Sequence, residues 1–116
     1  MPEVEPWKVS IYARRDQSEP YTEWERDLDR ADKKAAARVR AQIARIRLGN
    51  LGDCEPVGGG AFELKLDCGP GYRIYFGEMA RRHALLLLGG SKGRQPQDIK
   101  KAQEHWVEYK ERGDAE

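Results

Sequence analysis

The sequence predicts one α+β domain in which a small, mostly antiparallel sheet carries a helical hairpin near the N-terminus and one helix at the C-terminus. Three short segments alternate in polarity, a fourth is a leucine-rich run, and three others repeat apolar residues every three or four positions. A chain of 116 residues suffices for one modest core. The predicted order is strand, helix, helix, strand, strand, strand, helix. A single domain spans 1–116, with 1–5 and 113–116 expected to be loose.

The first strand and both helices of the hairpin are predicted within the first 50 residues. Residues 7–12 alternate apolar and polar side chains, as a half-buried strand does. Pro20 suits the first turn of a helix that ends near Arg30. Asp32 can cap a second helix, which Gly49 ends. Because so few residues separate the two helices, they are predicted to pack as a hairpin.

Two strands are predicted to form a β-hairpin in the middle of the chain. Residues 49–60 hold five glycines and one proline and are predicted to be a loop. Residues 62–68 and 72–76 then alternate in polarity on either side of a Gly-Pro-Gly turn. Three polar residues of the first strand are predicted to face outward: Glu63, Lys65 and Asp67.

A leucine-rich strand and a last helix complete the predicted fold. Residues 83–88 have no polar face, which predicts a strand buried on both sides near the middle of the sheet. The glycines at 89 and 90 are predicted to end this strand and to begin a loop over 89–95. Pro96 opens a helix with apolar residues at spacings of three and four.

Composition argues against several classes of protein. Charged residues make up 35% of the chain and hydrophobic residues 39%, as in a folded globular protein. The longest apolar run, 84–88, is far below the roughly 20 residues of a membrane helix. The acidic N-terminus lacks signal-peptide features, so a cytoplasmic location is expected. Cys54 and Cys68 lack metal-ligand spacing, and neither a metal nor a cofactor is expected.

Basic residues are concentrated in two stretches although the net charge is only +1. Residues 30–47 include seven basic residues and one acidic residue, and residues 69–94 include five and one. This asymmetry predicts a positive surface for a polyanion, although solvated faces would give the same pattern. The second helix supplies the residues expected to contact RNA phosphates: Arg38, Arg40, Arg45 and Arg47.

A polar patch is predicted where the strands of the β-hairpin lie side by side. If the register aligns their polar faces, four side chains share one surface: Glu63, Lys65, Arg73 and Tyr75. The loop 89–95 would add three more: Ser91, Lys92 and Arg94. Cationic side chains bind phosphate and an aromatic ring can stack on a base, so this patch is predicted to bind single-stranded RNA.

Cleavage of RNA without a metal requires the 2′-hydroxyl to attack the adjacent phosphate, so the site must remove one proton, supply another and stabilise negative charge. Arg73 is the predicted charge stabiliser, with Lys65 or Glu63 as the base. Lys92 or Arg94 would bind the phosphate or the leaving group. The alternative is structural, because the same residues would also make cross-strand ion pairs on a solvated sheet face.

Three motifs resemble one family of small bacterial proteins. They are LGNLGDCEPVGGG from Leu48, ELKLDCGPGYRIYF from Glu63, and LLLLGGSKGRQPQDIKKA ending at Ala102. The resemblance extends from the first strand to Trp106, and it is to the HigB-like "addiction module killer" branch of the RelE/ParE toxin superfamily. The predicted element order also fits the RelE-like fold.

The resemblance implies the toxin of a type II toxin–antitoxin system, an mRNA endoribonuclease that inhibits translation on the ribosome. Its implied partners are mRNA, ribosomal RNA at the A site and a HigA-like helix-turn-helix antitoxin, through which it would reach operator DNA. The functional basic residues of such toxins correspond to Lys65, Arg73 and either Lys92 or Arg94. The chain departs from the family's ribonucleases in carrying Glu63 in place of a second lysine, and Asp98–Lys100 where they place a tyrosine.

Two alternative functions are also consistent with the sequence. A ParE-like protein would inhibit DNA gyrase by binding alone and would need neither Lys65 nor Arg73. A degenerate toxin would serve mainly as a co-repressor that binds its antitoxin, and its expression would not arrest growth.

Overall fold

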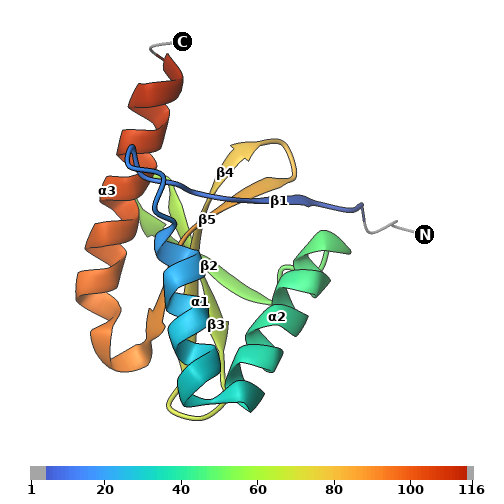
Figure 1. The fold of residues 1–116 in the computed structure, drawn as a ribbon. Coiled ribbons are helices and arrows are strands. Elements are labelled where there is room, and N and C mark those ends of the chain that lie inside the picture. The colour runs from blue at the N-terminus through green and yellow to red at the C-terminus, as the bar shows by residue number, and fades with distance from the viewer. Residues whose placement is uncertain (1–4, 115–116) are drawn as a thin grey trace.

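The computed structural model describes residues 5–114, which form an α+β fold with a mixed five-stranded sheet and three α-helices (Figure 1). The sheet order is β1-β5-β4-β3-β2. In chain order the elements are β1 (Lys8–Ile11), α1 (Pro20–Ala31), α2 (Lys33–Arg47), β2 (Asp53–Gly58), β3 (Ala61–Leu66), β4 (Tyr72–Ala80), β5 (His83–Ser91), a 3₁₀ turn η1 (Lys92–Arg94) and α3 (Gln95–Asp114).

The sheet is mostly antiparallel, as predicted. Strands β2 to β5 pair antiparallel in succession, and the short β1 pairs parallel with β5. The β1–β5 pairing runs from Lys8 opposite His83 to Ile11 opposite Leu86. Because β1 is so short, no described strand pairs with the last part of β5 on that side.

Helices cover both faces of the sheet (Figure 1). The α1–α2 hairpin packs on one face over a core that includes Val39, Leu64 and Ile74. On the other face α3 packs through Ala102 and Trp106. Since both faces are covered, a polar residue on either face of a central strand is buried unless it lies near a strand end.

The predicted boundaries of α1 and α2 are confirmed to within one residue. Pro20 is the first residue of α1, where its missing N–H leaves no hydrogen bond unmade. The Asp32 carboxylate accepts a hydrogen bond from the backbone N–H of Ala35 at 3.1 Å and so caps α2. Gly49, with a φ of 95°, follows the end of this helix.

The prediction of a loop over 49–60 is wrong, because Asp53–Gly58 forms strand β2. This strand lies at the edge of the sheet, where a proline such as Pro56 is tolerated because one side of the strand makes no ladder bonds. A register shift between Pro56 and Gly58 precedes the turn into β3. The glycines that suggested a loop therefore belong to an irregular edge strand and its turn.

The predicted end of the leucine-rich strand is also wrong. Strand β5 continues through Gly89 and Gly90 to Ser91, so the expected loop over 89–95 is reduced to the η1 turn. A Cβ atom at Gly89 would overlap the ring of Trp24, and one at Gly90 would overlap the Asp98 carboxylate. These glycines make room for side chains from neighbouring helices, and they do not break the strand.

The termini that were predicted to be loose fall partly outside the described residues, namely 1–4 and 115–116. Of the remainder, Gly113 and Asp114 belong to α3. No helix within residues 5–114 has both the length and the apolar character needed to span a membrane.

Candidate functional site

The hairpin of β3 and β4 brings the predicted site residues onto one face of the sheet. Lys65 lies directly opposite Arg73, and Glu63 lies directly opposite Tyr75. Directly paired residues in an antiparallel ladder project to the same side, so the predicted alignment of the polar faces is confirmed.

This face is covered at its centre, and the prediction that Glu63 faces outward is wrong. The exposed fraction is 0% for Glu63 and Tyr75 and 6% for Arg73. The first residue of α3 lies against them, since Gln95 Nε2 donates a hydrogen bond to Glu63 Oε2 at 2.7 Å. Alternation in the sequence distinguishes the two faces of a strand, but it does not show that a distant helix covers the polar one.

Glu63, Arg73 and Tyr75 form a buried polar cluster with incomplete hydrogen bonding. Arg73 Nε lies 3.7 Å from Glu63 Oε1, and an Nη of the same guanidinium donates to the Tyr72 carbonyl at 3.2 Å. No described group hydrogen-bonds to Glu63 Oε1, Arg73 Nε or the Tyr75 hydroxyl. Buried polar atoms without partners are costly, so this cluster lowers the stability of the fold.

Burial determines what Tyr75 can do. Desolvation raises the pKa of its phenol, and the Glu63 and Asp98 carboxylates raise it further. The phenol is therefore protonated at neutral pH and can donate a hydrogen bond. Its ring has no exposed surface on which the expected base could stack.

Lys65 lies at the more open end of the same face and is paired with an acid. Its Nζ lies 2.7 Å from Glu55 Oε1 on the edge strand β2. This hydrogen bond raises the pKa of Lys65, whereas a lysine that acts as a base needs a lowered pKa. The geometry therefore makes Lys65 a cation and not a proton acceptor.

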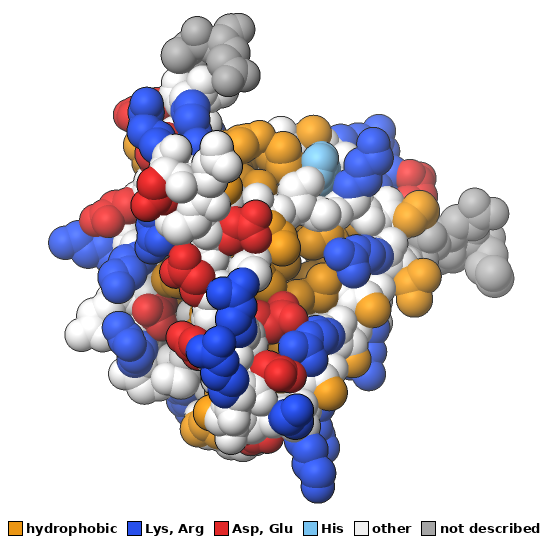
Figure 2. Space-filling view, in the orientation of Figure 1, with side chains coloured by type: hydrophobic (Ala, Val, Ile, Leu, Met, Phe, Trp, Pro, Cys, Tyr) orange, Lys and Arg blue, Asp and Glu red, His pale blue; other side chains and the backbone are white. Residues whose placement is uncertain are grey.

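The four arginines predicted to contact RNA divide between two sides of α2. Arg38 and Arg45 line a hollow of about 390 Å³ that Lys65 also borders. Arg40 and Arg47 line a different groove beside β1, and the guanidinium of Arg40 is paired with two acids of α1: Glu25 at 2.7 Å and Asp29 at 3.1 Å. Basic and acidic side chains lie interspersed over the helices in the space-filling view (Figure 2).

The last three residues of the predicted site, Ser91, Lys92 and Arg94, lie at one end of the sheet. Ser91 ends β5 opposite Tyr72, and the backbone N–H of Lys92 donates to the Gly71 carbonyl at 3.0 Å. A Cβ atom at Gly71 would lie 3.4 Å from Lys92 Cβ and 3.8 Å from Arg73 Nη1, so both cationic side chains flank this glycine. Lys92 and Arg94 are exposed, unlike Arg73.

The site thus contains one buried cation and two that are more accessible to solvent. Arg73 is buried and held by its neighbours, while Lys65 and Lys92 are more accessible and lie on either side of it. Such a set can bind and stabilise a phosphate. Within residues 5–114, no cluster of three or more acidic, histidine or cysteine side chains is arranged to hold a metal ion.

Sequence reasoning assigned no role to Gln95 or Asp98. Gln95 bonds to Glu63, and Asp98 is 4% exposed with its Oδ2 lacking a hydrogen-bond partner. The signal for Asp98 was its spacing, since it precedes the buried Ala102 and Trp106 at intervals of four on α3. An acidic residue on the apolar stripe of a helix is buried and needs an explanation.

Comparison with known proteins gives a family but no activity. No family model matches the chain. A protein of Haemophilus influenzae, described as uncharacterized, is 44% identical over 69 residues, which are 60% of this chain and 70% of that protein. The chain belongs to the family of that protein. No solved structure matches it.

Proposed function

We propose that this protein is a RelE-like, HigB-like toxin of a type II toxin–antitoxin system that cleaves mRNA on the ribosome in the cytoplasm, and that a cognate antitoxin neutralises it. The observation that carries the proposal is the grouping of Lys65, Arg73 and Lys92 at one end of the sheet. These three residues are also among the positions to which the sequence resemblance assigns function.

Arg73 is the charge stabiliser in this proposal. Its guanidinium is fixed by Glu63 and by the Tyr72 carbonyl, so it is oriented before substrate binds. Lys65 and Lys92 flank it and would hold the phosphates on either side of the scissile bond. The hollow lined by Arg38 and Arg45 would contact ribosomal RNA.

Glu63 is the better candidate for the proton acceptor, because Glu55 keeps Lys65 protonated. Glu63 is bonded to Gln95 and buried, so the first turn of α3 has to move before a 2′-hydroxyl can reach the carboxylate. Product formation would therefore depend on a local opening at Gln95.

The same burial favours a second candidate function. A ParE-like toxin that inhibits DNA gyrase by binding needs no accessible proton acceptor, and its cluster of Glu63, Arg73 and Tyr75 would be purely structural. The two functions differ in whether messages are cut.

The test is expression of the chain without an antitoxin, followed within minutes by mapping of mRNA 5′ ends. We expect growth arrest and new ends within translated regions. Lys92→Ala changes an exposed residue and should reduce cutting about tenfold or more, and Arg73→Lys should do the same while keeping a buried cation. Arg81→Ala is the matched control, because Arg81 is exposed in the β4–β5 turn, away from the site.

Three other results of this experiment would change the proposed function or its site. Arrest with intact mRNA would replace the nuclease with the gyrase inhibitor. Absence of arrest would favour a degenerate toxin that acts as a co-repressor. Full cutting by both site variants would show that the site is wrongly assigned.

A further inference from the structure

A hollow of about 390 Å³ lies where the edge of β5 is left open. Strand β1 pairs with β5 only as far as Leu86, and none of the strands within residues 5–114 pairs with the segment 87–91 on that side. Helix α1 borders this notch from one face of the sheet and the start of α3 borders it from the other. On the α1 side its walls include Arg14, Trp24 and the carboxylates of Glu23 and Asp27, and on the α3 side they include Arg94, Asp98 and Lys101.

Two glycines allow the walls to lie close to the strand. The Trp24 ring occupies the space where Gly89 would carry a side chain, and the Asp98 carboxylate does so at Gly90. The two glycines project to opposite faces, so an aromatic surface and a carboxylate come to the same notch from opposite sides of the sheet.

The Asp98 carboxylate is the unexplained group in this notch. It is 4% exposed, and its Oδ2 has no hydrogen-bond partner among the described residues. Burial raises the pKa of Asp98, while the positive charges of Arg94 and Lys101 oppose that shift. A buried carboxylate oxygen without a donor is costly, and a ligand that supplies donors would remove the cost.

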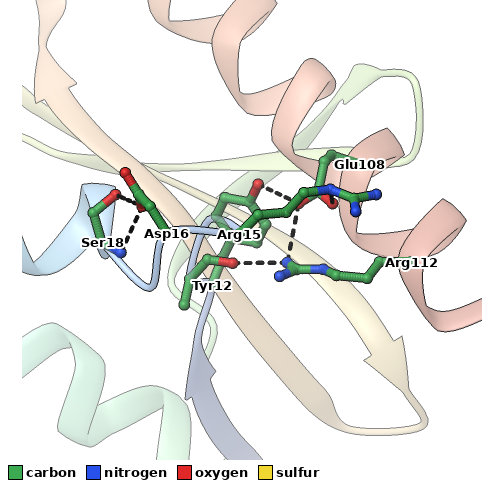
Figure 3. A network of polar contacts seen from close by, with 7 residues as sticks. Tyr12, Arg15, Asp16, Ser18, Glu108 and Arg112 are labelled. Atoms are coloured by element: carbon green, nitrogen blue, oxygen red, sulfur yellow. Dashed lines mark hydrogen bonds and ion pairs between the residues drawn. The ribbon is translucent and has the colours of Figure 1, made fainter.

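The cations at the rim indicate the other end of such a ligand. Arg94 and Lys101 are exposed and line the α3 side of the notch, whereas Arg14 on the opposite side is paired with Glu23 at 3.9 Å. The segment that carries Arg14 is tied to α3, since the Tyr12 hydroxyl donates a hydrogen bond to Glu108, and Arg112, which forms an ion pair with Glu108, donates to the Ala13 carbonyl (Figure 3). This wall is therefore fixed in place, and the α3 side of the rim, with Arg94 and Lys101, is the side that suits a phosphate.

We propose that the notch binds a guanine nucleotide of RNA and is the base-selecting subsite of the nuclease, an assignment that rests on the proposed function. A carboxylate accepts hydrogen bonds and donates none. Guanine is the base that places two donors, N1–H and the N2 amino group, side by side on its Watson–Crick edge. The other bases pair one donor with an adjacent acceptor, which a carboxylate repels.

The position of the notch fits this role. Gly90, against which Asp98 packs, is the direct sheet partner of Arg73. Adjacent strands lie about 5 Å apart, so an RNA whose base is held at Asp98 would bring the neighbouring phosphate of its backbone near the cations of the proposed site. Trp24 provides the apolar wall for the base, and Arg94 and Lys101 contact the phosphate.

The test is calorimetric titration of the protein with GMP, AMP, CMP and UMP, and with the trinucleotides ApGpA and ApApA. We expect GMP and ApGpA to bind about tenfold or more tightly than the others. Asp98→Asn keeps the side-chain size but replaces one acceptor by a donor, and it should abolish the preference for guanine. Lys101→Ala should weaken all nucleotides alike, whereas Lys100→Ala, the adjacent lysine outside the notch, should leave the affinities unchanged.

Equal affinity for all four bases, no binding of either GMP or ApGpA, or an unchanged guanine preference in Asp98→Asn would each overturn the proposal. Thermal melts of every variant show whether it is folded. Binding is measured without cleavage, so the two proposals fail separately. Guanine binding without mRNA cutting would reject the nuclease alone, and cutting without guanine binding would reject the subsite alone.

Discussion

The two faces of the sheet are both covered by helices, yet they differ in what they bury. Beneath α1 and α2 the sheet contributes apolar side chains such as Leu64 and Ile74. Beneath the start of α3 it contributes Glu63, Arg73 and Tyr75, with several polar atoms unpaired. Apolar burial stabilises the fold, whereas buried polar atoms without partners reduce its stability, which is what the proposed function would explain.

The largest effect should come from breaking the apolar face. Leu64→Ala removes a fully buried side chain between β3 and the helical hairpin. We expect the free energy of unfolding to fall by about 2–5 kcal/mol, because transfer energy is lost and a cavity remains. Denaturant titration measures this loss. A loss well below 1 kcal/mol would show that this face is not the main source of stability.

A smaller loss of stability should arise on the α3 face as pH falls. Burial lowers the pKa of His105 on α3, and Arg14 lowers it further. The folded state therefore binds a proton less readily than the unfolded state does, so stability is present above about pH 6.5 and is lost as pH falls below it. The expected loss is about 1 kcal/mol or less.

Unfolding curves between pH 7.5 and 5 test this prediction. His105→Gln should lose less stability than the wild type over this range. Identical slopes in the two proteins would contradict the prediction.

The difference between the faces also explains what the sequence could predict. Helix positions followed from apolar stripes and from local signals such as Pro20 and Asp32, which act within a few residues. Strand β2 was missed because an edge strand tolerates glycine and proline. Its recognition required knowledge of the partner strand.

Burial of the candidate site could not be predicted for a related reason. Alternation placed Glu63 and Arg73 on one face correctly, but the helix that covers this face contacts Glu63 through Gln95, which lies 32 residues further along the chain. Gly89 and Gly90 suggested a loop because the side chains that occupy their space, Trp24 and Asp98, are distant in sequence. Local sequence patterns indicate the two faces of a strand and the ends of a helix. Contacts between residues distant in sequence determine which side chains are buried.

The most direct test of the account is the double variant Glu63→Leu/Arg73→Met, measured for both stability and mRNA cutting. Replacing a buried ion pair by apolar residues of similar size is often neutral or stabilising, so we expect the free energy of unfolding to stay within about 1 kcal/mol of the wild type or to rise. Cutting of mRNA should be lost completely. A variant that still cuts mRNA, or one that no longer folds, would contradict the claim that this polar cluster serves function at the expense of stability.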